Sequence, residues 1–335
     1  MKNYPFLFFA FLISFFANSQ NTVNSKNHTS IGSVEIKEKE LDLLISTAQA
    51  IEVLADGFTW AEGPIWVPHL SGLLFSDVPN NKVYLWTEKE GLQLFLDPSG
   101  HTGYAKSSQT KGANGLTLDA KGNLILCQVG DRRIGRLKNW GFKTPIYETI
   151  VDRYDSRLFN SPNDLVLTKN QTLYFTDPPY GLKGQDQDDL KELPFNGVYR
   201  FTEKEGILLL SSNLKRPNGI ALSIDEKILY VANSDIQSPY IYSYEITKNG
   251  VKNEKLFFDG SALLKKNVGL FDGLKVHSSG ILFATGPGGV LIIDAKGKHL
   301  GTIYTDSRTA NCAFDLNESY LYMTSHTRLT RIKLK

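Results

Sequence analysis

The sequence is poor in cysteine and carries no excess charge of one sign. Its 335 residues include 2 cysteines, Cys127 and Cys312, which are too few for a disulfide framework. Each lies in an apolar, strand-like segment, where buried free thiols are common, so we expect no bridge between them. The 37 basic and 35 acidic side chains give a formal net charge of +2. This balance argues against nucleic acid and anionic membranes as partners.

The motifs of several common enzyme classes are also missing. The sequence has no G-x-S-x-G nucleophile elbow, no H-E-x-x-H zinc motif and no P-loop, which argues against the catalytic sites that depend on them. The 6 histidines are scattered along the chain, a distribution typical of surface and core residues. His101 and His326 are the two candidates among them for contact with a functional site.

Long apolar runs are absent, apart from one near the N-terminus. Residues 5–17 are almost wholly apolar, follow the positively charged start Met1-Lys2-Asn3, and lead into the small-x-small sequence Ala17-Asn18-Ser19. This pattern predicts a signal peptide over residues 1–19 and an exported protein, periplasmic or secreted. An uncleaved anchor is the alternative. The run is shorter than the about 20 residues of a comfortable membrane span, so we expect no stable membrane insertion.

We expect a polar spacer over residues 20–48 and one folded domain over residues 49–335. A weak helical pattern at residues 34–47 is the only candidate for an amphipathic helix. The domain instead contains short segments rich in β-branched and aromatic residues, such as TLYFTD, ILYVAN and ILFATG, separated by Gly, Asn, Asp and Pro. Such segments are typical of strands. Their number favours a sandwich, a barrel or a propeller.

An internal repeat distinguishes among these all-β folds. An acidic or amide residue, usually followed by Gly, precedes a strand, a turn and a second strand, and this pattern recurs at intervals of 39 to 55 residues. The six positions are Glu62, Asn114, Asn163, Asn218, Asp272 and Asn311. Six units of this length, each with room for four strands, predict a six-bladed β-propeller. The strand at residues 50–55 is expected to pair with the last one, at residues 329–334, and so to close the ring.

The repeated residue occupies the same place in every blade, so the six would form a ring around the central channel. Two carboxylates and four amides, with no thiol or imidazole, suit Ca²⁺ or Mg²⁺ better than Zn²⁺ or Cu²⁺. Two buried carboxylates that face each other also need a counter-ion. The alternative is that these are turn residues, since Asn-Gly and Asp-Gly favour turns anyway. Six in register, with acids only at the first and fifth positions, favour the ring.

Long connections are expected at the mouth of this channel. Residues 97–113 and 178–196 are long enough to be lids, and functional loops are often of this kind. Arg132 and Arg133 follow the second strand of the second repeat, which returns to the same face. The sequence therefore predicts a site at the channel mouth, beneath two lids.

At the repeat motifs the sequence closely resembles the gluconolactonase, regucalcin and luciferin-regenerating-enzyme family. The resemblance runs from about Ile51 to the C-terminus. Its recurring phrases are Glu62-Gly-Pro64, Asn114-Gly-Leu116, Ser161-Pro-Asn-Asp-Leu165, Tyr174-Phe-Thr-Asp-Pro-Pro-Tyr-Gly181, Arg216-Pro-Asn-Gly-Ile220 and Asp272-Gly-Leu274. The resemblance implies a six-bladed propeller, lactonase activity in many members, and one divalent metal ion. Ca²⁺ is the leading candidate for that ion, with Mg²⁺, Mn²⁺ and Zn²⁺ as alternatives.

The resemblance also assigns residues to roles. The family's metal ligands fall on Glu62, Asn163, Asn218 and Asp272, and Asp272 takes the place of the proposed catalytic base. Two departures concern the substrate rather than the metal. Val129 stands where close relatives often have His, and Ser161 stands where regucalcin-like members have an Arg that meets the substrate.

The leading hypothesis is a metal-dependent hydrolase of small-molecule sugar lactones. In it the metal polarises the lactone carbonyl and Asp272 takes a proton from the attacking water. Asn114, Asn163, Arg132 and His101 are the candidates to bind sugar hydroxyls. The alternative is a non-catalytic exported propeller that binds a carbohydrate or a protein and uses its metal structurally. A third interpretation is another enzyme on the same scaffold, such as an arylesterase or a quinone-cofactor sugar dehydrogenase.

Overall fold

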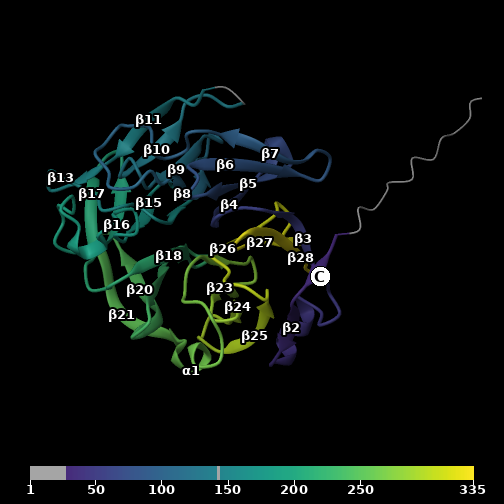
Figure 1. The fold of residues 1–335 in the computed structure, drawn as a ribbon. Helices are drawn as coiled ribbons and strands as arrows, with labels where there is room; N and C mark the ends of the chain where they lie inside the picture. The colour runs from purple at the N-terminus through teal and green to yellow at the C-terminus, as the bar shows by residue number, and fades with distance from the viewer. Residues whose placement is uncertain (1–27, 142–143) are drawn as a thin grey trace, which may run out of the picture.

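Six sheets surround a common centre in the computed structural model, which describes residues 28–141 and 144–335 (Figure 1). Each sheet is a blade of four antiparallel strands, and two of the blades carry a fifth strand at the outer edge. The innermost strands of successive blades contact one another in turn, and that of the sixth contacts that of the first. The prediction of an all-β, six-bladed propeller is confirmed. The predicted signal peptide lies outside the described residues.

The first three blades take their strands in chain order from the centre outward. Blade 1 contains β4 (Ala61–Val67), β5 (Gly72–Asp77), β6 (Lys82–Thr87) and β7 (Gly91–Leu96). Blade 2 contains β8 (Ala113–Leu118), β9 (Leu124–Gln128), β10 (Arg133–Leu137) and β11 (Tyr147–Val151). Blade 3 contains β14 (Leu165–Leu167), β15 (Leu173–Asp177), β16 (Gly197–Thr202) and β17 (Gly206–Ser211). A hairpin of β12 (Arg153–Tyr154) and β13 (Arg157–Leu158) lies between blades 2 and 3 in the sequence.

Blade 4 also takes its strands in chain order, whereas blades 5 and 6 include strands from the N-terminal part of the chain. Blade 4 contains β18 (Pro217–Leu222), β19 (Ile228–Asp235), β20 (Ser238–Thr247) and β21 (Gly250–Asp259). Blade 5 contains β22 (Leu274–Val276), β23 (Leu282–Gly286), β24 (Gly289–Ile293), β25 (His299–Tyr304) and, at its edge, β2 (Ser33–Ile36). Blade 6 contains β26 (Asn311–Phe314), β27 (Tyr320–Ser325), β28 (Arg328–Lys333), β3 (Ile51–Asp56) and, at its edge, β1 (Ser30–Ile31). The short helices are α1 (Ser261–Leu264) and the 3₁₀ turns Lys39–Leu43, Pro68–Leu70 and Gln185–Gln187.

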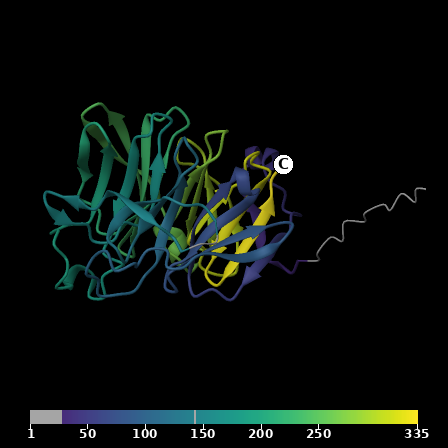
Figure 2. The same ribbon diagram turned by 90° about the horizontal axis from the view of Figure 1, so that it is seen from above.

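Blade 6 closes the ring as the sequence predicted. Strand β3 pairs antiparallel with β28, with Leu329 opposite Ala55 and Ile332 opposite Ile51. Figures 1 and 2 show the purple N-terminal strand beside the yellow C-terminal strands. The pairing joins the two ends of the domain within one sheet, so neither β3 nor β28 is left with an open edge at that contact.

The segment before β3 is part of the domain, so the expected spacer does not extend over its second half. Val34 lies opposite Ile303 in the pairing of β2 with β25. Leu41 and Ile45 are fully buried in the core cluster shared by blades 5 and 6. The weak helical candidate over residues 34–47 instead forms strand β2 and the 3₁₀ turn Lys39–Leu43. Apolar residues alternate along β2 and meet the free edge of β25, and this pairing outweighs the weak helical pattern.

Apolar residues of neighbouring blades form the core. One cluster joins Val67 and Leu74 of blade 1 to Leu116 and Leu126 of blade 2, and comparable clusters fill the other gaps between blades. Cys127 and Cys312 are both buried and free, and they lie in different core clusters. In the described part of the chain, no helix has the length and apolar character needed to span a membrane.

Candidate functional site

A cavity of about 710 Å³ lies at the centre of the ring. Five of the six repeated residues line it: Glu62, Asn114, Asn163, Asn218 and Asp272. They belong to the first strand of each blade or directly precede it, so the blade repeat itself carries them to the channel. The sixth, Asn311, lies at the start of β26 outside the cavity lining. The structure thus brings together all four side chains expected to bind a metal.

The glycines of the repeat allow the inner strands to approach closely. A Cβ atom on Gly63 would lie 2.0 Å from the carbonyl oxygen of Asn114, and one on Gly219 would lie 1.9 Å from that of Asp272. A Cβ on Gly273 would lie 2.2 Å from the side chain of Asn311. Any larger residue would push neighbouring blades apart. The glycines of the repeated Asn-Gly and Asp-Gly pairs therefore allow close packing of the inner strands around the channel, and the pairs are not ordinary surface turns.

Glu62 and Asp272 form a strongly interacting acidic pair in this ring. Burial raises the pKa of Glu62 to about 7, and the nearby charge of Asp164 adds to the rise, while a hydrogen bond from the Gly63 amide opposes it. Burial, followed by the charges of Glu62 and Asp164, raises the pKa of Asp272 well above its usual value. The charge of Glu62 thus disfavours the charged form of Asp272, and the charge of Asp164 disfavours the charged forms of both. A bound cation would relieve this repulsion.

Asp164 and Lys275 extend the charged group behind the ring. The side-chain amide of Asn311 donates to Asp164 Oδ2 at 3.4 Å, and its carbonyl oxygen accepts from Lys275 Nζ at 3.3 Å. Lys275 Nζ also donates to the carbonyl oxygen of Leu274. Asn311 therefore links an anion to a cation inside the propeller, which agrees with a structural role for this residue.

Two amide oxygens of the ring have no hydrogen-bond partner. Asn218 donates from Nδ2 to Ser234 Oγ at 3.1 Å, whereas the Oδ1 atoms of Asn218 and Asn114 are buried and unpaired. Such atoms are costly unless a ligand or water meets them. Within residues 28–141 and 144–335, no group of three or more His, Cys, Asp and Glu side chains could hold a metal ion. A cation here would therefore need amide oxygens beside the two carboxylates.

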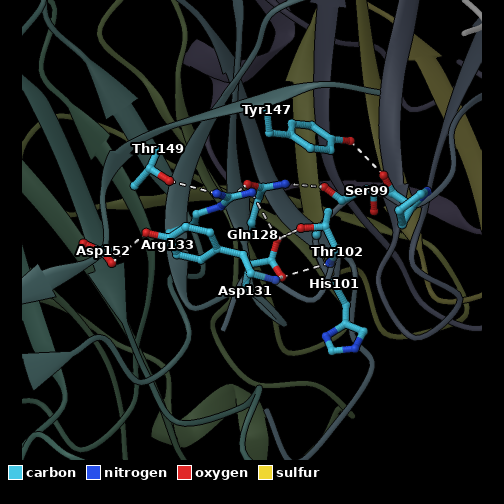
Figure 3. Close-up of polar contacts among 12 residues, drawn as sticks. Ser99, His101, Thr102, Gln128, Asp131, Arg133, Tyr147, Thr149 and Asp152 are labelled. Atoms are coloured by element: carbon cyan, nitrogen blue, oxygen red, sulfur yellow. Dashed lines mark hydrogen bonds and ion pairs between the residues drawn. The ribbon is translucent and has the colours of Figure 1, made fainter. Parts of the chain in front are cut away.

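Arg132 and His101 lie outside the cavity lining, unlike the other expected substrate contacts. Arg132 is 1% exposed and donates from Nε to the carbonyl oxygen of Phe159 at 2.6 Å, with Glu192 3.6 Å from its guanidinium. Figure 3 shows the His101 ring pointing away from the polar network around Asp131. The sequence placed both residues near the mouth but gave no sign of their side-chain directions.

The polar network in Figure 3 anchors the first lid. Asp131 accepts hydrogen bonds from the Thr102 backbone at 2.9 Å and from the Thr102 hydroxyl at 2.5 Å. Arg133 donates to Gln128 and Asp131, and its guanidinium lies 4.0 Å from the centre of the Tyr104 ring. Arg133 thus supports the loop and does not line the cavity.

Lys111 and Tyr180, to which the sequence gave no role, line the cavity together with Ser234 of β19. Lys111 Nζ donates to the carbonyl oxygen of Tyr180 at 2.8 Å, and burial lowers the pKa of Lys111. Burial raises the pKa of Tyr180, and hydrogen bonds with Ser234 and Asn218 oppose the rise. Lys111 and Tyr180 lie in the two predicted lids. The lids could be found by their length, and Tyr180 belongs to one of the quoted motifs, but the sequence did not indicate that either side chain lines the cavity.

The two lids also contact each other. Ser108 Oγ of the first lid donates to Asp188 Oδ2 of the second at 2.8 Å and accepts from the Lys183 backbone at 2.8 Å. With the contact between Lys111 and Tyr180, these bonds join both lids over one side of the cavity.

Comparison with known proteins agrees with this arrangement. Residues 60–327 match the family model described as SMP-30/Gluconolactonase/LRE-like region. The chain is 36% identical over 330 residues to a gluconolactonase of Zymomonas mobilis, covering 95% of this chain and 90% of that protein. A gluconolactonase structure from Xanthomonas campestris superposes with a TM-score of 0.80 at 28% identity, covering 92% of this chain and 98% of that one. The calcium-binding protein regucalcin from Agrobacterium tumefaciens shares the fold, with a TM-score of 0.65 at 15% identity over 84% of this chain and 94% of that one.

Proposed function

Because the chain belongs to the SMP-30/gluconolactonase/LRE-like family, we propose that it is a lactonase that opens sugar lactones by hydrolysis. The observation that carries the proposal is the convergence of Glu62, Asn163, Asn218 and Asp272 on one central cavity. The 36% identity to a gluconolactonase extends over almost the whole chain. It therefore includes the segments that build this cavity.

The proposal includes one divalent metal ion at the ring, with Ca²⁺ as the leading candidate. Glu62, Asn163, Asn218 and Asp272 would hold it. The repelling carboxylates and the unpaired Oδ1 of Asn218 fit such an ion, and an all-oxygen ligand set suits Ca²⁺ or Mg²⁺. Such an ion supplies Lewis-acid polarisation of the lactone carbonyl.

Asp272 is the proposed general base. Its carboxylate would take a proton from the water that attacks the carbonyl carbon, and the proton would pass to the ring oxygen as the ester bond breaks. The product is a hydroxy acid. The positive charge of a cation beside Asp272 would keep its carboxyl group ionised, so that the carboxylate can accept the proton.

Polar side chains around the ring would orient the substrate. Asn114 has a buried, unpaired Oδ1 that could accept a hydrogen bond from a sugar hydroxyl. Lys111 and Tyr180 line the same cavity and can donate hydrogen bonds. Arg132 is engaged with Phe159 and Glu192, so we assign it to loop support.

The deciding experiment is a lactonase assay on the purified protein after chelation and dialysis. Hydrolysis of glucono-1,5-lactone is followed by acid release, with and without Ca²⁺, Mg²⁺, Mn²⁺ and Zn²⁺ and corrected for spontaneous opening. We expect turnover that depends on the metal. Turnover equal to the blank under all conditions would favour the non-catalytic binding propeller instead.

We also propose that the protein is exported, to the periplasm or beyond the cell. The support is the sequence pattern of residues 1–19. N-terminal sequencing of protein purified from cell fractions tests it. A mature protein that starts near residue 20 and is absent from the cytoplasm is expected, whereas an intact Met1 in a cytoplasmic fraction would refute export.

A further inference from the structure

One side of the cavity mouth is aliphatic. Ile236 lies in the turn between β19 and β20, and Leu264, Val268 and Leu270 lie in the connection that leads to β22. All four line the cavity, yet Ile236 is 72% exposed and Val268 is 62% exposed. Single exposed aliphatic side chains are ordinary on a protein surface. Four in neighbouring segments around one cavity are what an apolar part of a ligand would contact.

A second apolar group lies across the ring. Trp60, Val78 and Pro79 line the cavity from blade 1, and blade 1 is opposite blade 4 in a ring of six. The carboxylates and amides lie on the inner strands between these two sides. The cavity is therefore polar at the ring and carries apolar side chains on two sides of its mouth, with Asn267 as a polar residue within the side formed by Leu264, Val268 and Leu270.

This distribution differs from what a bare sugar lactone needs. Such a substrate has hydroxyl groups on nearly every carbon, and hydroxyls placed against aliphatic side chains lose water without gaining a partner. Trp60 could stack on a sugar ring, but Ile236, Leu264 and Val268 offer neither an aromatic plane nor a hydrogen bond. The volume of about 710 Å³ falls within the range of sites for drug-sized ligands, about 300–1,000 Å³.

We propose that the site accepts lactones that carry an aliphatic chain on the carbon bonded to the ring oxygen, with the chain lying against Ile236, Leu264 and Val268. The inference rests on the proposed lactonase function and names its substrate class. The ester group would lie at the ring of Glu62 and Asp272. The chain would lie at the mouth, where it replaces water on exposed aliphatic surface.

A series of δ-lactones tests the proposal on the full chain. We compare kcat/KM for δ-hexalactone, δ-octalactone and δ-decalactone with that for glucono-1,5-lactone, which has the same ring size. Each methylene buried at the wall is expected to raise kcat/KM by up to about fourfold, until the chain leaves the cavity.

Paired variants locate the effect. Ile236→Ser combined with Val268→Ser changes two exposed side chains and is expected to flatten the dependence on chain length. Leu316→Ser is the matched control, because Leu316 is 69% exposed in the turn between β26 and β27 and does not line the cavity. It should keep the dependence of the parent protein.

The outcomes separate this inference from the proposed function. Hydrolysis of glucono-1,5-lactone without any gain along the alkyl series overturns the inference and leaves the proposed function standing. A gain that the Ile236→Ser, Val268→Ser variant retains also overturns the assignment of the aliphatic wall. Failure to hydrolyse any lactone in either group overturns both.

Discussion

Glu62, Asp164 and Asp272 carry three negative charges around one channel when all are ionised. Lys275 supplies one positive charge through its contact with Asn311, and Lys111 and Arg308 line the same cavity. The repulsion is therefore local to Glu62 and Asp272, whose pKa values are both raised. A cation held between these two carboxylates would relieve it.

Substitutions at three ring positions distinguish residues that bind the metal from residues that contact substrate or support the fold. Glu62→Gln keeps the shape but removes a charge, so metal affinity should fall by at least tenfold. Asn114→Ala should leave metal affinity nearly unchanged and raise KM. Asn311→Ala should mainly lower stability, by about 1–3 kcal/mol, because it removes the hydrogen bond to Asp164 Oδ2 and one of the two acceptors of Lys275 Nζ. Calorimetric metal titration and melting curves of the three variants check this, and an equal loss of affinity in all three would show a symmetric six-residue cage.

Asp272→Ala should abolish turnover while the protein stays folded. The substitution removes both a proposed ligand and the proposed base, whereas the blades are held by apolar contacts elsewhere. Acid release and circular dichroism measure the two effects. Retention of most of the activity would be incompatible with the mechanism.

The raised pKa of Glu62 predicts how metal-free protein responds to pH. The folded state binds this proton up to about pH 7, whereas the usual pKa of an exposed glutamate is 4.5. Folded protein therefore binds more protons than unfolded protein between these values, so the free energy of unfolding falls as pH rises through this window. Denaturant melts in chelator at pH 5 and pH 8 measure the fall. Glu62→Gln should show a smaller fall, and millimolar Ca²⁺ should restore the parent at pH 8; identical pH dependence in parent and variant would contradict the assignment.

At the scale of elements, the two lids behave as one unit. The first lid is anchored to blade 2 through Asp131, and Ser108 joins it to Asp188 of the second. Lys111 and Tyr180 reach the cavity from these lids. Their positions therefore depend on hydrogen bonds made outside the cavity.

Breaking the contact between the lids should weaken substrate binding. Ser108→Ala removes the bonds to Asp188 and Lys183, and a loss of about 1 kcal/mol corresponds to a rise in KM of about fivefold with a smaller change in kcat. Ser223→Ala is a matched control, since Ser223 bonds to Asp225 in the turn after β18, away from the cavity. Equal KM values in both variants would show that the lids act independently.

At the scale of the whole molecule, the N-terminal segment belongs to the propeller. Leu41→Ala should lower stability by about 2–5 kcal/mol, because Leu41 is fully buried between blades 5 and 6. The neighbouring Leu43 is 83% exposed, so Leu43→Ala should change stability by no more than about 0.5 kcal/mol. Thermal and denaturant melts of the pair test this. If the two variants unfold alike, the segment contributes nothing to the fold.

The repeat explains why the sequence predicted so much of the fold and of the ring. Glu62, Asn114 and Asn218 are at equivalent positions in different blades. Finding the repeat in the sequence therefore identifies the residues of the ring without knowledge of any loop. Lys111 and Tyr180 are not part of the repeat, and their positions depend on contacts between distant loops. For Arg132 the sequence predicted the position of the backbone near the channel mouth, but not the direction of the side chain. Its guanidinium contacts Phe159 and Glu192 and does not line the cavity.

The pairing of β3 with β28 determines when, during translation, the ring can close. Asp56 and Arg328, which meet across this pairing, are 272 residues apart in the chain. The edge of β3 must therefore stay unpaired while five blades are being made, and the ring cannot close until β28 has left the ribosome. A nascent chain that cannot finish folding remains open to chaperones and to passage through a membrane channel as an extended polymer. The pairing of β3 with β28 that closes the finished ring thus delays the end of folding until translation is nearly over.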